Sequence, residues 1–196
     1  MQHPAAKRAS CEDLLKVPDR MLAQIIDGEL VVLPRPASGH ARASSALGAE
    51  LFGPFDRPRG GSGGPGGWWI LDEPELHLGD DVLVPDLAGW RRERMPAFPA
   101  DAAFFVQAPD WVCEVLSPST VRLDRIRKLG IYAREAVAHV WLVEPHQQIL
   151  EVFRLEQGRW VVAGQFEGAA RVRAEPFAEV ELELERWWPP EAPPAR

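Results

Sequence analysis

Short apolar runs separated by turn-forming residues recur along most of the chain. The runs Met21–Ile26 and Leu30–Leu33 flank Asp27-Gly28, and an Asp-Gly pair between two such runs predicts a hairpin. Further runs, many of them rich in β-branched and aromatic residues, predict additional strands. They are Trp68–Leu71, Val82–Trp90, Trp111–Leu116, Ala138–Val143, Ile149–Leu155, Trp160–Val162 and Val180–Leu184.

Three other segments have the spacing or the capping residues of helices. They are Ser10 to about Val17, His40–Phe52, and Ser119 or Thr120 to about Glu135. Ser10 and Asp13 form a capping box for the first helix, and Ser38 is the expected cap of the second. The order of elements predicts an α/β (α+β mixed) fold, with a central mixed β-sheet flanked by helices.

The length of 196 residues suits a single domain. We expect this domain to cover residues 10–188, with a loose N-terminal segment at 1–9 and a Pro-rich tail at 189–196. We find no apolar run long enough for a membrane span, no apolar leader and no cysteine framework. The expected location is therefore cytoplasmic, without contact to a membrane.

Glu114 interrupts the apolar run Trp111–Leu116. Because side chains alternate between the two faces of a strand, Val112, Glu114 and Leu116 share one face. A carboxylate among large apolar neighbours is unfavourable unless it is paired or binds a metal ion. Glu114 is the strongest site candidate that the pattern itself provides.

Lys128 is the only lysine after Lys16, in a chain with 22 basic residues. It follows Glu114 by 14 residues, and Asp86 precedes Glu114 by 28. Two carboxylates and a nearby lysine suit a Mg²⁺-dependent phosphodiesterase, because carboxylates hold a hard cation and the lysine steadies charge or prepares the attacking water. The alternative is an exposed helix residue paired with Asp124, and spacing alone does not decide between the two.

The net charge of −7 argues against a large nonspecific nucleic-acid surface. Basic residues nevertheless cluster after both candidate carboxylates, either as a rim that faces phosphates or as ordinary solvated faces. They are Arg91, Arg92 and Arg94 after Asp86, and Arg122, Arg125, Arg127 and Lys128 after Glu114. The Gly-rich segment 60–67 predicts a flexible loop. It lacks the following Lys-Ser or Lys-Thr of a phosphate-binding loop, so we expect no nucleotide cofactor.

Pro85-Asp86, the string Glu114-Val-Leu-Ser-Pro-Ser-Thr120, and Asp124, Lys128 and Tyr132 resemble the Uma-type family of putative restriction endonucleases, in the PD-(D/E)XK nuclease superfamily. The resemblance implies a restriction-endonuclease-like core and a metal-dependent nuclease site. Asp86 and Glu114 would be ligands of Mg²⁺, or of Mn²⁺, with the Val115 carbonyl as a third. Lys128, placed on the following helix, would orient the water or stabilise the developing charge.

Gln24 stands where the family usually carries a glutamate, so this chain lacks one anion of the expected site. The amide oxygen of Gln24 can still be offered to Mg²⁺ as a neutral ligand. We treat Gln24, His40 and Tyr132 as accessory candidates. The basic residues expected to contact nucleic acid are Arg91, Arg92, Arg122 and Arg125.

Three functional hypotheses follow. The first is a metal-dependent DNA endonuclease in which Asp86, Glu114 and Lys128 carry the chemistry. The second is a catalytically weakened relative that binds nucleic acid or assembles, with Trp187-Trp188 providing apolar surface for a homodimer. The third is a hydrolase for a different phosphoester.

Overall fold

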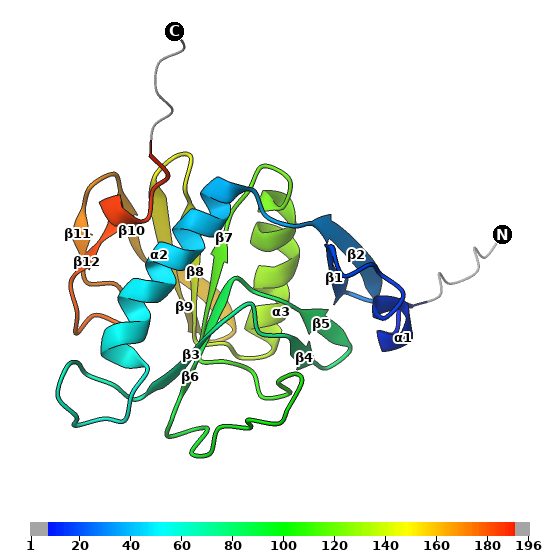
Figure 1. Cartoon of the computed structure of the whole chain (residues 1–196), viewed down its shortest axis with the longest axis horizontal. Helices are drawn as coiled ribbons and strands as arrows, with labels where there is room; N and C mark the ends of the chain where they lie inside the picture. The colour runs from blue at the N-terminus through cyan, green and yellow to red at the C-terminus, as the bar shows by residue number, and fades with distance from the viewer. Residues whose placement is uncertain (1–7, 191–196) are drawn as a thin grey trace, which may run out of the picture.

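A six-stranded mixed sheet forms the centre of the protein in a computed structural model that describes residues 8–190 (Figure 1). The strand order is β10-β9-β8-β7-β6-β3, and only β7 and β8 pair in parallel. The strands are β3 (Trp68–Asp72), β6 (Leu87–Arg91), β7 (Trp111–Val115), β8 (His139–Glu144), β9 (Ile149–Glu156) and β10 (Arg159–Glu167). The predicted mixed sheet is confirmed.

Two smaller sheets flank the central one. The larger of them has the order β2-β1-β5-β4, and β11 pairs with β12 in the other. The four-stranded sheet contains β1 (Met21–Ile26), β2 (Glu29–Pro34), β4 (Leu76–Leu78) and β5 (Asp81–Leu83). The two-stranded sheet contains β11 (Arg171–Val172) and β12 (Leu182–Glu183). Asp27 and Gly28 both have positive φ between β1 and β2, as a type I′ turn requires, so the predicted hairpin is confirmed.

Helices cover the two faces of the central sheet. On one face, α2 (Ser38–Phe55) buries Leu47 and Leu51 against a cluster that includes Trp111, Cys113 and Val115 of β7. On the other face, α3 (Leu129–Arg134) packs Ile131 and Tyr132 against the opposite side of the same strand. A π-helix, η1 (Leu123–Lys128), leads into α3, while α1 (Cys11–Leu14) and the 3-10 helix η2 (Leu184–Arg186) are short. None of the helices between residues 8 and 190 is long and apolar enough to cross a membrane.

The predicted strand Val82–Trp90 is wrong as one element. Its first part, β5, belongs to the small sheet, and its last part, β6, belongs to the central sheet. Between β5 and β6, Pro85 has no backbone N–H that could donate a hydrogen bond to a neighbouring strand. The Val84 N–H donates to the side chain of Gln24, at 3.0 Å from Oε1. This crossing from one sheet to the other places Asp86 where the two sheets meet.

Other boundaries also differ from the predictions. Ser38 is the first residue of α2, and Ala37 occupies the cap position, so Ser38 is not the cap. The expected strand at Val180–Leu184 is reduced to the two residues of β12, because the chain then turns into η2. Strand β4 was not predicted, since its three residues lie in an acidic stretch that resembles turns.

The C-terminal tryptophans are buried within the chain. Trp187 is 0% exposed and Trp188 6%, and both belong to the cluster beneath α2. Trp187 Nε1 donates to Glu50 Oε2 of α2 at 2.6 Å. The prediction that this pair provides surface for a homodimer is therefore wrong, because the protein's own core uses it.

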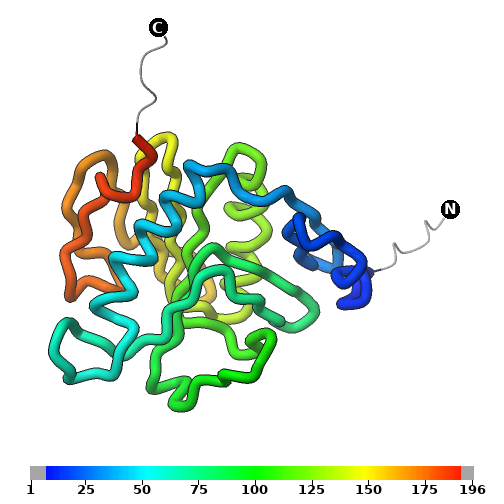
Figure 2. Tube along the Cα trace, in the orientation of Figure 1, coloured from blue at the N-terminus to red at the C-terminus, as the bar shows by residue number. Residues whose placement is uncertain are grey.

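The predicted terminal segments fall largely outside the described residues, which exclude 1–7 and 191–196. Of the predicted N-terminal segment, the structure describes Arg8 and Ala9. Ala9 N donates to Gly28 O at 2.8 Å, and Arg8 pairs with Asp80 at 2.8 Å. The Cα trace shows the loop that follows α2, predicted from its glycines, running beside the far end of that helix before β3 begins (Figure 2).

Candidate active site

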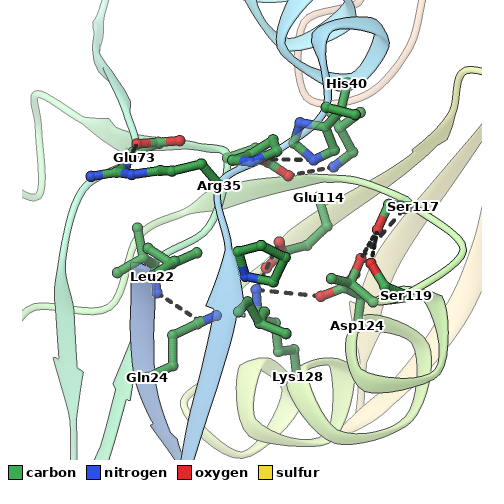
Figure 3. Close-up of a pocket in the computed structure, with 18 of the residues that line it drawn as sticks. Leu22, Gln24, Arg35, His40, Glu73, Glu114, Ser117, Ser119, Asp124 and Lys128 are labelled. Carbon is green, nitrogen blue, oxygen red and sulfur yellow. Dashed lines mark hydrogen bonds and ion pairs between the residues drawn. The ribbon is translucent and has the colours of Figure 1, made fainter. Parts of the chain in front are cut away.

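A cavity of about 330 Å³ lies where the hairpin, the start of β6, the end of β7 and η1 come together (Figure 3). Asp86, Glu114, Val115 and Lys128 all line it, as do Gln24 and His40. Residues from four distant parts of the sequence thus share one space.

Asp86 is fixed by one hydrogen bond from the backbone and one contact with a side chain. The Val115 N–H donates to Asp86 Oδ2 at 2.7 Å, and His40 Nε2 lies 3.3 Å from Asp86 Oδ1. Burial disfavours the charged form of His40, but the hydrogen bond and charge of Asp86 outweigh it and raise the His40 pKa above its ordinary value. His40 therefore contacts Asp86 from the start of α2.

Glu114 is 3% exposed and has a donor at each oxygen. Lys128 Nζ lies 2.9 Å from Oε2, and the Tyr132 hydroxyl donates to Oε1 at 2.5 Å. Burial raises the pKa of Glu114 to about 8, Lys128 and Tyr132 oppose this, and the negative charges of Asp124 and Asp86 add to it. The carboxylate lies on the face that strand alternation predicts, among the apolar residues of the α3 side.

Lys128 is the buried cation of the site. It is 3% exposed and also pairs with Asp124 Oδ1 at 3.3 Å. Burial alone would lower the pKa of its ammonium, but Glu114, Asp124 and Asp86 together raise it. The interpretation of Lys128 as an exposed helix residue is wrong, although the pairing with Asp124 that it assumed is present.

Gln24 is completely buried, and only one of the two polar atoms of its side-chain amide has a hydrogen-bond partner among the described residues. Its Oε1 accepts the Val84 N–H, whereas its Nε2 has no hydrogen-bond partner among the described residues. The oxygen that the sequence offered as a neutral metal ligand is thus already used by the backbone between β5 and β6.

The four arginines expected to contact nucleic acid do not gather around this cavity. Arg91 is the last residue of β6 and Arg92 follows it, at the end opposite Asp86. Arg91 lies about 16 Å from Asp86 along the strand at 3.3 Å per residue, and Arg92 pairs with Asp56 at 2.8 Å. Arg125 forms ion pairs with Glu151 and Glu144. Arg122 is exposed at the start of the helical segment after Thr120, beside the loop that borders the cavity.

Sequence reasoning missed Arg35 and the hydroxyl groups of the loop after β7. Arg35 lines the cavity from the connection between β2 and α2, and Nη1 contacts Glu73 at 3.4 Å. Ser117 Oγ lies 3.0 Å from both Ser119 Oγ and Thr120 Oγ1, and all three residues line the cavity. The one available signal was that prolines flank Arg35, which favours an extended connection.

The donor set suits a magnesium ion that keeps part of its water shell. Between residues 8 and 190 no group of three His, Cys, Asp or Glu side chains is arranged as a metal cluster. Mg²⁺ needs fewer protein ligands, because one or two carboxylates and several waters commonly complete its coordination. Four acidic side chains line the cavity, namely Glu73, Asp86, Glu114 and Asp124, against the basic side chains of Arg35, His40 and Lys128. A divalent cation would neutralise the remaining negative charge.

Comparison with known proteins places the chain in a family. The model of the Uma2 family, described as putative restriction endonuclease, matches residues 11–186. The crystal structure of a putative nuclease belonging to DUF820 from Anabaena variabilis aligns with a TM-score of 0.71 and 24% identity, over 90% of this chain and 96% of that one. At this identity the likeness shows a shared fold. No curated protein matches the chain. The chain belongs to the Uma2 family of putative restriction endonucleases.

Proposed function

We propose that this protein is a Mg²⁺-dependent endonuclease that hydrolyses phosphodiester bonds of DNA. The observation that carries the proposal is that Asp86, Glu114 and Lys128, from a sheet crossing, a strand and a π-helix, line one cavity. Membership of a family of putative restriction endonucleases supports a nuclease over other phosphoester hydrolases.

Asp86 and Glu114 would hold the metal ion, with the Val115 carbonyl as a third oxygen ligand. Each carboxylate oxygen can accept more than the single contact it now has, so both groups retain capacity for a cation. When bound, Mg²⁺ supplies Lewis-acid polarisation of the phosphate and lowers the pKa of a coordinated water.

The chain's own residues supply orientation and charge. His40 and the Val115 N–H fix Asp86, while Tyr132 fixes Glu114 from the α3 side. Lys128 keeps a positive charge inside the cavity, where it steadies negative charge that develops on the phosphate or orients the attacking water. Because these groups are held before the substrate arrives, little reorganisation is needed during the reaction.

Plasmid cleavage with Mg²⁺, and then with Mn²⁺, tests the proposal. Asp86→Asn keeps the size of the side chain but removes the charge, so we expect cleavage to fall by more than about 100-fold. Asp101→Asn makes the same change at an exposed position and should cut like the parent. Equal cleavage by the Asp86 and Asp101 variants, both folded by circular dichroism, would refute the proposed metal site.

The second candidate is a catalytically weakened module that binds nucleic acid. It is favoured by Gln24, whose oxygen is engaged with the Val84 N–H where a glutamate would add a charge. Binding of DNA by the parent without cleavage under either metal would favour this reading. A homodimer and a cytoplasmic location stay predictions from the sequence, and the homodimer no longer has Trp187-Trp188 as its support.

A further inference from the structure

Gln24 carries an unpaired buried donor inside the candidate active site. Its side chain is 0% exposed and lines the cavity, and Nε2 has no partner among residues 8–190. In Figure 3 the Gln24 side chain reaches from β1 toward the space that Glu114 and Lys128 border. Buried polar groups without partners are unusual, and at a cavity they indicate an acceptor that arrives with a ligand.

The orientation of this amide follows from its surroundings. Oε1 accepts the Val84 N–H at 3.0 Å. Exchanging the oxygen and nitrogen would set the amide NH₂ against that N–H, so two donors would meet and both would lack an acceptor. Hydrogen bonding therefore directs the nitrogen, and not the oxygen, away from Val84.

We infer that Gln24 binds substrate, with Nε2 donating a hydrogen bond to a non-bridging oxygen of the phosphate that the cavity receives. This inference rests on the proposed function, because it assigns a phosphodiester to the same site. It replaces the expectation of a neutral metal ligand by a role as a donor to an anion. Lys128 lines the same cavity and adds a positive charge there, which favours an anionic ligand.

The donor role and the ligand role predict opposite effects for Gln24→Glu. As a metal ligand, position 24 gains from a carboxylate, which binds Mg²⁺ more strongly than an amide oxygen does. As a donor to phosphate, it loses its hydrogen and acquires a charge that repels the substrate. Gln24→Glu still offers an oxygen to the Val84 N–H, so the variant keeps the contact that holds the crossing between β5 and β6.

Binding of a labelled DNA duplex, followed by fluorescence anisotropy in EDTA and again in Ca²⁺, separates the two roles. In EDTA we expect Gln24→Met, which has no donor, to weaken binding about 10-fold, as loss of a hydrogen bond to a charged group does. Gln24→Glu should weaken it at least as much. Gln157→Glu, the same change in the exposed turn between β9 and β10, should bind like the parent.

Several results would overturn the inference. Parental affinity of Gln24→Met would mean that Nε2 does not touch phosphate, and stronger binding by Gln24→Glu in Ca²⁺ would restore the ligand role. Failure of the parent to bind DNA in either condition would also remove it. The outcome is independent of cleavage, since a parent that binds through Gln24 without cutting would leave this inference standing and refute the endonuclease. Thermal melting of each variant checks that it is folded.

Discussion

At the scale of single residues, Glu114 depends on two donors from successive turns of one helical segment. Lys128 supplies charge and Tyr132 a neutral hydroxyl. We predict that Tyr132→Phe lowers the free energy of unfolding by about 1–3 kcal/mol, because a buried acceptor loses its partner. It should also reduce cleavage about 10- to 100-fold, as loss of a group that orients a metal ligand does. Chemical denaturation and plasmid cleavage measure the two effects, and parental values for both would show that the hydroxyl does not hold Glu114.

The sequence predicted some residues of the cavity and not others for identifiable reasons. Glu114 stands out because burial of a carboxylate conflicts with its apolar run, and that conflict is visible in the sequence itself. Arg91 and Arg92 were linked to Asp86 through proximity in sequence, but the rise of β6 carries them to its other end. Arg35 has no such conflict, and only the path of the β2–α2 connection brings it to the cavity.

At the scale of elements, Arg127 joins the helix of Lys128 to the hairpin of Gln24. Its Nε donates to Asp27 Oδ2 at 3.0 Å and its Nη1 to Glu29 Oε2 at 2.8 Å. We predict that Arg127→Met lowers the free energy of unfolding by about 1 kcal/mol, since these contacts are partly exposed, and that it weakens cleavage by loosening the two sides of the cavity. Arg159→Met, at the exposed start of β10, is the control for loss of a positive charge. Equal melting and cleavage of the two variants would contradict the link.

Local patterns predicted elements well where the determinants are local. The Asp27-Gly28 turn and the alternation of β7 depend on a few neighbouring residues, and both are confirmed. The break at Val84-Pro85 depends on Gln24 from another strand, so the run Val82–Trp90 gave no sign of it beyond the proline. The π-helix η1 likewise has no hydrophobic period of its own that would distinguish it from an α-helix.

At the scale of the whole molecule, the segment after β12 completes the core beneath α2. Trp187 stacks near Trp141 with ring centroids 6.1 Å apart, and its Nε1 donates to Glu50. Trp188 Nε1 donates to Gly168 O at 2.7 Å. The family model matches residues 11–186, so the two tryptophans directly follow the matched region. They pack into the hydrophobic core that residues of the matched region form.

This arrangement predicts the effect of removing Trp187. Trp187→Ala deletes a fully buried aromatic side chain, so we expect the free energy of unfolding to fall by about 3–5 kcal/mol. Leu15→Ala, at a side chain that is 86% exposed, should leave stability nearly unchanged.

Sedimentation velocity under native conditions should give the same oligomeric state for the parent and for the folded fraction of the Trp187 variant. If Trp187→Ala instead converted a dimer into a monomer with little loss of stability, the ring would belong to an interface between chains. Its packing against Trp141 and α2 argues for the first result, because a side chain already surrounded by its own chain has no surface left to offer a partner.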